Sequence, residues 1–226
     1  MSEVVQEPEI AEPQVIVTRW WFVRHAPVVD AAQHRLSGQK DVDADLGDTR
    51  TLRATAARLP KDAIWLTTHL KRTRQTAEAL WDGGAEHIEP VVVRDFAEQA
   101  FGAWTGLTWD EVSKLEDKTA ARFWDDPANI SPPPSQKYSA ESFAAVCNRV
   151  SLSLEDLTRK HGGRNVVCVA HAGTVRAAVA HALGLTAEQA LAIDVKNASL
   201  TRLDHITDGL RVKRGGSWRI VGLNMI

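Results

Sequence analysis

The stretch Trp20-Trp21-Phe22-Val23-Arg24-His25-Ala26-Pro27 carries the strongest fold signal in this chain. Its four large apolar residues do not alternate with polar ones, which is typical of a strand buried on both faces of a sheet. Pro27 ends the pattern because proline has no N–H to donate to a neighbouring strand. Arg24 and His25 are therefore predicted at the carboxyl end of a central strand, where open α/β sheets bind ligands. On this stretch alone, a salt-bridged arginine and an incidental histidine remain an alternative.

Beyond this stretch, short apolar runs alternate with helical patterns. Such alternation favours a three-layer α/β/α sandwich with a mostly parallel central sheet and helices on both faces. Strands are predicted at residues 15–23, 63–67, 91–93, 166–170, 198–206 and 217–223, the last two as an antiparallel ending. Helices are predicted at residues 48–59, 70–82, 140–160 and 172–183, and capping patterns begin two more at Thr108 and Thr186. The pattern breaks up over residues 122–138, which are predicted to be a surface insertion.

The length and composition of the chain suit one globular domain. Of its 226 residues, 44% are hydrophobic and 25% are charged, which is ordinary for such a domain. The formal net charge of −2 provides no broad positive field that would indicate a nucleic acid partner. No apolar run has the length of a membrane span and no signal-peptide pattern follows Met1. A cytoplasmic protein without a membrane partner is therefore expected.

Residues 1–14 differ from the rest of the chain, since they contain four glutamates, two prolines and no basic residue. They lack the apolar periodicity to fold alone and are interpreted as a flexible acidic arm. Residues 15–226 then form the domain. Cys147 and Cys168 fall in a helical pattern and in a buried strand pattern. We interpret them as small core residues rather than as a disulfide or a metal site.

A second buried strand also ends in a histidine, His171, which would emerge at the same sheet edge as His25. A helix begins directly after His171, and its free N–H groups favour negative charge. Arg72 lies in the first turn of another predicted helix, against the helix dipole, and a bound anion would explain this placement. These junctions together indicate an anion pocket. For His171 alone, a hydrogen-bonded core histidine is the alternative.

Four motifs of this chain, in this order, resemble those of the histidine phosphatase superfamily, whose fold is phosphoglycerate mutase-like. They are Arg24-His25-Ala26-Pro27, Leu70-Lys71-Arg72-Thr73-Arg74-Gln75-Thr76-Ala77, Glu98-Gln99-Ala100-Phe101-Gly102-Ala103-Trp104-Thr105-Gly106 and Val169-Ala170-His171-Ala172-Gly173. Three weaker family features are Gly38-Gln39-Lys40-Asp41, Glu141-Ser142-Phe143 and Asn197-Ala198-Ser199. The motif that begins at Glu98, together with the short chain, looks most like the α-ribazole phosphatase branch.

The resemblance implies a role for each of five residues. His25 matches the nucleophile that attacks phosphorus and becomes a phosphohistidine, which requires a neutral imidazole. The phosphate-binding pocket is matched by Arg24, Arg72 and a cationic His171. These cations would stabilise the phosphoryl charge in place of a metal ion. Glu98 matches the acid that protonates the leaving group and then activates water. The resemblance implies no metal and no other cofactor.

The function implied is that of a metal-independent phosphomonoester hydrolase acting on a small phosphorylated metabolite. α-Ribazole phosphate, from cobalamin biosynthesis, is the candidate substrate. A phosphoglycerate mutase is the first alternative. A catalytically silent relative that binds a phosphorylated ligand or a protein partner is the second. The sequence leaves a homodimer open.

Two departures from the family pattern lie in the loop after the predicted nucleophile. Ala26 replaces the usual glycine, and Ala31 replaces a frequent asparagine. One hydrogen bond to phosphate is therefore either lost or supplied elsewhere, for instance by Gln39 or Ser37.

Residues 95–138 are predicted to form a capping insertion over the site. Three tryptophans, Trp104, Trp109 and Trp124, fall in this insertion and are expected in its roof. An aromatic roof would suit an aromatic or nucleoside-like leaving group.

Overall fold

The computed structural model describes residues 15–29, 31–116, 118–209 and 216–226, so the arm predicted at residues 1–14 lies outside the described residues. Within this part, the strands are β1 (Val17–Arg24), β2 (Ala63–Thr67), β3 (Val91–Val92), β4 (Asn165–Ala170), β5 (Leu200–Ile206) and β6 (Trp218–Met225). The α-helices are α1 (Thr49–Ala56), α2 (Lys71–Asp82), α3 (Trp109–Ser113), α4 (Lys118–Asp125), α5 (Phe143–Lys160), α6 (Ala172–Leu183) and α7 (Ala187–Leu191). None of the described helices combines the length and apolar character that a bilayer span requires.

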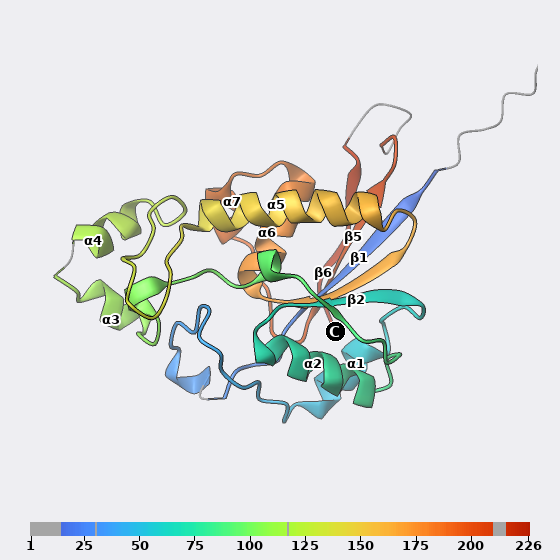
Figure 1. Cartoon of the computed structure of the whole chain (residues 1–226), viewed down its shortest axis with the longest axis horizontal. Helices are drawn as coiled ribbons and strands as arrows, with labels where there is room; N and C mark the ends of the chain where they lie inside the picture. The colour runs from blue at the N-terminus through green and yellow to red at the C-terminus, as the bar shows by residue number, and fades with distance from the viewer. Residues whose placement is uncertain (1–14, 30, 117, 210–215) are drawn as a thin grey trace, which may run out of the picture.

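The strands form one sheet with the order β3-β2-β4-β1-β5-β6. β3, β2, β4 and β1 run parallel, whereas β5 is antiparallel to both of its neighbours. In Figure 1, α5, α6 and α7 cover one face of the sheet, and α1 and α2 cover the other. This arrangement confirms the predicted three-layer α/β/α sandwich with a mostly parallel central sheet.

Side chains of the sheet alternate between two apolar clusters, one under each layer of helices. Trp20 and Phe22 of β1 are fully buried in the cluster that contains Val150 of α5 and Val179 of α6. Val23 points to the opposite cluster, which contains Leu80 of α2. Helices on both faces thus hold the carboxyl end of β1, and this fixes the backbone that leads into the predicted site.

The first strand differs from its prediction in two respects. It begins at Val17 rather than at residue 15, and it continues through Arg24. Trp21 is only half-buried, although the sequence predicted burial on both faces. β1 borders the antiparallel strand β5, and the guanidinium of Arg202 from β5 lies 4.4 Å from the centroid of the Trp21 ring. A cation therefore covers part of this face, as in other cation–π contacts.

The predicted break in pattern over residues 122–138 is wrong at its beginning, because α4 extends through Asp125. α4 has only two turns, and its apolar residues Ala120 and Phe123 do not pack on the sheet. They belong to a separate cluster at the end of the molecule where α3 and α4 lie (Figure 1). The buried members of this cluster are Leu36, Trp104, Val112, Ala120 and Phe123.

Candidate active site

The two predicted histidines lie side by side at the carboxyl edge of the sheet. β1 and β4 are parallel neighbours in a register that pairs Arg24 with Ala170. The next residues, His25 and His171, therefore emerge together, and the centroids of their rings are 5.2 Å apart. The backbone N–H of His25 also donates to the Ala170 carbonyl at 2.9 Å. The predicted shared edge is confirmed by this geometry.

Both ring nitrogens of His25 have partners in the folded chain. Nδ1 lies 2.6 Å from the Ala26 carbonyl oxygen, so Nδ1 carries the proton and donates it. Nε2 accepts from Arg72 Nε at 3.3 Å. Burial, followed by the charge of Arg72, lowers the pKa of His25 to about 3. The ring is therefore neutral, and its lone pair lies on Nε2, toward Arg72.

The backbone around His25 is held by side chains from two other segments. Asn197 Nδ2 donates to the His25 carbonyl at 2.9 Å, which gives one of the weaker sequence features a position beside the site. Ala26 N donates at 2.9 Å to the Thr76 hydroxyl, which in turn donates to the Arg72 carbonyl at 2.7 Å. The loop after β1 is therefore fastened to α2 despite the replacement of the usual glycine.

Arg72 is the second residue of α2 and is 1% exposed. Its Nη1 donates to the Lys40 carbonyl at 3.0 Å, and its Nη2 donates to the Gly38 carbonyl at 2.7 Å. Burial lowers the pKa of Arg72 to about 10, which still leaves it charged at neutral pH. The structure thus places a buried cation at a helix N-terminus, as the sequence predicted, and bonds to carbonyl groups fix its orientation.

Arg24 and His171 each have one buried nitrogen without a partner. Arg24 Nη1 donates to the Val195 carbonyl, whereas its Nε is buried and unpaired. His171 Nε2 lies 2.9 Å from the Thr68 hydroxyl, whereas its Nδ1 is buried and unpaired. Buried polar atoms normally have hydrogen-bond partners, because leaving one unpaired costs about 1–3 kcal/mol. Arg24 Nε always carries a proton, and His171 Nδ1 carries one when Nε2 accepts from the Thr68 hydroxyl, so in that tautomer both atoms can donate to an anionic group.

The resemblance implied a cationic His171 in the phosphate pocket, whereas the surroundings of the ring in the free protein favour the neutral form. Burial, followed by the charge of Arg72, lowers the pKa of His171 well below its usual range. The ring is fully buried and thus neutral. Thr68, which sequence reasoning did not single out, holds Nε2 and leaves Nδ1 free.

Glu98 follows a short 3₁₀ turn at Arg94–Phe96 and reaches the same edge of the sheet. Its Oε2 lies 3.5 Å from Gly173 N at the start of α6, and its Oε1 accepts from Gln99 N at 2.9 Å. A Cβ on residue 173 would lie 2.3 Å from Oε1, so this approach requires glycine. Burial lowers the pKa of Arg24, and the negative charge of Glu98 acts against this shift.

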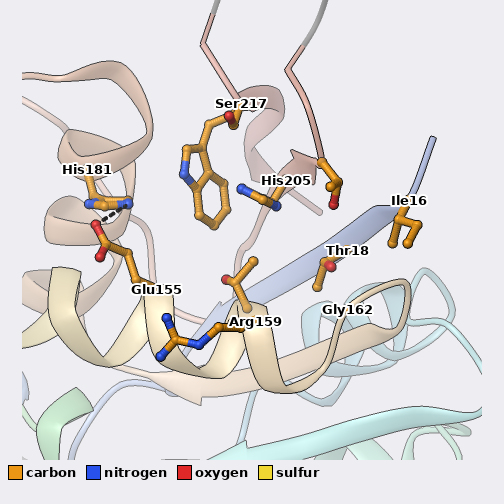
Figure 2. Close-up of a pocket in the computed structure, with 11 residues that line it drawn as sticks. Ile16, Thr18, Glu155, Arg159, Gly162, His181, His205 and Ser217 are labelled. Atoms are coloured by element: carbon orange, nitrogen blue, oxygen red, sulfur yellow. Dashed lines mark ion pairs between the residues drawn. The ribbon is translucent and has the colours of Figure 1, made fainter. Parts of the chain in front are cut away.

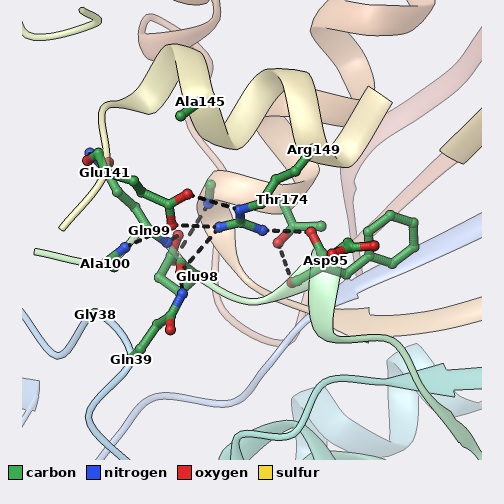
Figure 3. A network of polar contacts seen from close by, with 12 residues as sticks. Gly38, Gln39, Asp95, Glu98, Gln99, Ala100, Glu141, Ala145, Arg149 and Thr174 are labelled. Carbon is green, nitrogen blue, oxygen red and sulfur yellow. Dashed lines mark hydrogen bonds and ion pairs between the residues drawn. The ribbon is translucent and has the colours of Figure 1, made fainter. Parts of the chain in front are cut away.

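The five predicted site residues therefore lie at one sheet edge, and a further group of residues holds the loop that carries Glu98. Figure 3 shows this group, in which Arg149 of α5 and Glu141 pair beside the loop. Gln39, one of the two residues suggested as a substitute phosphate donor, donates from Nε2 to the Glu98 carbonyl at 3.0 Å. This amide therefore also holds the loop that carries Glu98.

A cavity of about 230 Å³ lies on the far side of Glu98, between the loop, α6 and the helices α3 and α4. Its wall contains Trp109 and Trp124, as the predicted roof required. Trp104 does not line it, because this side chain is 1% exposed and packs against Phe123 inside the α3–α4 cluster. Two of the three tryptophans predicted in the roof thus line the cavity beside Glu98, and the third does not.

A larger cavity, of about 700 Å³, lies near the amino end of β1 and contains none of the predicted site residues. Figure 2 shows its side chains, which come from β1, α5, α6 and the β5–β6 pair. They include Thr18, Glu155, Arg159, His181, His205 and Trp218. Of the predicted site residues, only Glu98 lines the smaller cavity. His25, Arg72 and His171 are themselves buried at the edge of the sheet beside it.

Neither cysteine has the environment of a reactive thiol. Cys168 is buried in β4, and burial raises the pKa of its thiol far above the usual range. Cys147 packs against the same core cluster, and burial raises its pKa to about 11. Within the described residues, no three His, Cys, Asp or Glu side chains are grouped as metal ligands would be.

Comparison with known proteins identifies the family to which the chain belongs. A family model described as "Histidine phosphatase superfamily (branch 1)" matches residues 20–217. The chain belongs to the histidine phosphatase superfamily. This membership, with phosphatase-named relatives, confirms the predicted class of enzyme, a phosphoric monoester hydrolase.

Two relatives of this histidine phosphatase are named for phosphoserine. One is a metal-independent phosphoserine phosphatase of Arabidopsis thaliana, 29% identical over 168 residues, which cover 71% of this chain and 67% of the relative. The other is phosphoserine phosphatase 1 of Hydrogenobacter thermophilus, 27% identical over 181 residues, which cover 79% of this chain and 82% of the relative.

A solved structure of a putative α-ribazole-5′-P phosphatase from Escherichia coli has the same fold. Its TM-score is 0.76 at 17% sequence identity, over 92% of this chain and 98% of that one. At this identity the similarity supports the fold alone.

Proposed function

We propose that this histidine phosphatase is a metal-independent phosphomonoester hydrolase that works through a phosphohistidine on His25. The observation that carries the proposal is the pair of unpaired buried nitrogens, Arg24 Nε and His171 Nδ1, beside the neutral His25 ring. A phosphoryl group would satisfy both nitrogens while Arg72 neutralises its charge. Such positioning and charge stabilisation are the main demands of phosphoryl transfer.

In the first step, Arg72 Nε shifts its hydrogen bond from His25 Nε2 to a phosphoryl oxygen, which frees the Nε2 lone pair. Nε2 then attacks phosphorus, and the bond from phosphorus to the leaving oxygen breaks. Nδ1 keeps its proton and continues to donate a hydrogen bond to the Ala26 carbonyl, which stabilises the positively charged ring that forms. Protonated Glu98 donates its proton to the leaving oxygen, so that the product departs as an alcohol. Arg24, Arg72 and His171 hold the phosphoryl oxygens throughout this step.

In the second step, water attacks the phosphohistidine and the bond between phosphorus and Nε2 breaks. The Glu98 carboxylate takes a proton from the attacking water and returns to its acid form. Inorganic phosphate is released and neutral His25 is regenerated.

Residues 95–138 serve as a cap in this proposal, and the aromatic wall of the 230 Å³ cavity receives the leaving group. The rings of Trp109 and Trp124 offer stacking surfaces, with their centroids 5.6 Å apart. This wall favours α-ribazole phosphate, whose leaving group carries an aromatic base, over phosphoserine. Activity on it would place the enzyme in cobalamin biosynthesis.

The test is a substrate panel assayed with the full chain in the presence of EDTA. The panel contains 4-nitrophenyl phosphate, α-ribazole phosphate, phosphoserine and 3-phosphoglycerate. We expect hydrolysis without added metal, with the highest kcat/KM for α-ribazole phosphate, and an acid-labile phosphoenzyme that is absent from His25→Ala. Isomerisation of 3-phosphoglycerate would instead identify a mutase. The absence of both turnover and phosphoenzyme would identify a silent binding protein.

A further inference from the structure

Arg149 on α5 binds the loop that carries Glu98 at two backbone positions. Its Nη1 donates to the Asp95 carbonyl at 2.5 Å, and its Nη2 donates to the Glu98 carbonyl at 3.3 Å. The other edge of the guanidinium faces the Glu141 carboxylate, with Nε to Oε2 at 3.0 Å and Nη2 to Oε1 at 2.9 Å (Figure 3). A single planar fork therefore joins α5, the loop and Glu141.

Glu141 holds the same loop from its other end. Its Oε1 accepts from Ala100 N at 3.1 Å, and its own N–H donates to the Ala100 carbonyl at 3.0 Å. Its carbonyl accepts from Gln99 Nε2 at 3.0 Å. Glu141 and Arg149 together thus fix the backbone on both sides of Glu98.

The backbone of Glu98 then has little freedom. Its carbonyl is bonded by Arg149 and by Gln39 Nε2, and its carboxylate by Gln99 N. The segment from residue 97 to residue 100 contains no helix or strand, so these side-chain bonds take the place of a regular backbone ladder.

The Arg149–Glu141 pair differs from an ordinary surface ion pair. The two side chains are 21% and 19% exposed, and the contact is bidentate. Exposed pairs contribute little because water and salt screen them, whereas a partly buried fork adds both energy and orientation. On the same helix, Arg159 pairs with Asp156, and those side chains are 77% and 67% exposed.

We propose that Arg149 and Glu141 are positioning residues that set the geometry of Glu98 toward the leaving group. The inference rests on the proposed function, because it assumes that Glu98 is the proton donor. A displacement of about 1 Å in a catalytic group can cost about 100-fold in rate. Loss of the fork would therefore weaken proton transfer without removing either the nucleophile or the phosphate pocket.

The experiment compares leaving groups of different basicity. General acid catalysis matters most for a basic leaving group, so phenyl phosphate depends on Glu98 more than 4-nitrophenyl phosphate does. kcat/KM reports the steps through formation of the phosphoenzyme and excludes its later hydrolysis. We expect Arg149→Gln to lower kcat/KM about 10- to 100-fold for phenyl phosphate and less than about 3-fold for 4-nitrophenyl phosphate.

Four further variants make the result specific. Glu98→Gln gives the largest decrease in kcat/KM expected for phenyl phosphate. In the double variant, Glu98→Gln with Arg149→Gln, kcat/KM should not decrease further. Glu141→Gln keeps the shape of the side chain, so it tests the fork if Arg149→Gln fails to fold. Arg159→Gln is the matched control and should leave kcat/KM unchanged for both substrates.

Equal losses on the two substrates, or additive losses in the double variant, would overturn the proposal, because both indicate a merely structural role. Failure of the proposed function has a different result, namely a wild-type protein that hydrolyses neither aryl phosphate. If wild type is active and only Glu98→Gln discriminates between the substrates, the function stands and the positioning role is wrong.

Discussion

The lowered pKa of His25 determines how the folded protein responds to acid. The folded ring titrates at about 3, against 6.5 for an ordinary histidine, so between these values the unfolded chain binds the extra proton. Stability therefore rises with pH in this window and is lost as the pH falls below 6.5. Between about pH 8 and about pH 5, the titration of His25 alone should lower the free energy of unfolding by about 2 kcal/mol.

Urea unfolding of wild type and His25→Gln at the two pH values measures this contribution. The variant should lose about 2 kcal/mol less between them, since glutamine does not titrate. An identical loss in both proteins would contradict the neutral state assigned to His25.

Gly173 illustrates how a single hydrogen atom can set the position of the acid. In Gly173→Ala, the added methyl group would lie 2.3 Å from Glu98 Oε1, so the carboxylate has to move away. Alanine is a good helix former, so the stability of α6 should change by less than about 1 kcal/mol. We expect kcat/KM for phenyl phosphate to fall about 100-fold while the melting temperature changes little.

The matched control for this prediction is Gly162→Ala, where the nearest atom to an added Cβ is 3.8 Å away. A Gly173→Ala enzyme with wild-type kcat/KM would show that the position of Glu98 is not restricted by α6.

Residue roles could be predicted only where a residue stands in a motif or at the end of an apolar run. Arg24 is the last residue of β1, His25 and His171 directly follow β1 and β4, and the structure brings the three together. Thr68 and Arg149 carry no such signal, because their importance comes from partners 103 and 51 residues away. The contact of Gln39 with the Glu98 carbonyl was not predictable for the same reason, since these partners are 59 residues apart.

The α3–α4 insertion is the element that sequence reasoning described least well. Long helices with one apolar face, such as α5, were predicted within a few residues. α4 was missed because two turns contain too few periodic positions, and its burial depends on Leu36 and Trp104. Tertiary contacts of this kind are not visible in a short window of sequence.

The same insertion yields a prediction about specificity. Trp124 is 48% exposed and lines the cavity beside Glu98. Trp124→Ala should therefore remove a stacking surface, worth about 1 kcal/mol, without opening a hole in the core. We expect kcat/KM to fall about 5-fold or more for aromatic phosphate esters and to stay unchanged for a small alkyl phosphate.

Trp218→Ala provides the comparison, because this tryptophan lines the other cavity. This substitution should leave the ratio of kcat/KM for the aromatic esters to kcat/KM for the alkyl ester unchanged. Equal losses on aromatic and alkyl esters in Trp124→Ala would indicate a role in folding rather than in binding.

At the scale of the whole molecule, the strand order explains why distant motifs meet. β1, β4 and β2 are parallel neighbours near the centre of the sheet, and their carboxyl ends lead into His25, His171 and the turn before Arg72. The alternation of strands and helices was enough to predict this layered fold. The strand order itself was not predictable from periodicity, because it is set by which crossovers pack against each other.

Because the site joins three strand ends, an anion bound there should stabilise the entire fold. Orthovanadate at about 100 times its Kd should add about 2.7 kcal/mol, or a rise in melting temperature of roughly 5–10 °C for a chain of this size. Arg72→Gln removes a buried cation from the pocket and should lose most of this rise. Arg74→Gln, on the same helix, should keep it, because Arg74 points outward and pairs with Glu78 and Glu89. Equal rises in melting temperature in the two variants would mean that vanadate binds elsewhere. Binding at the sheet edge would then not be the source of the stabilisation.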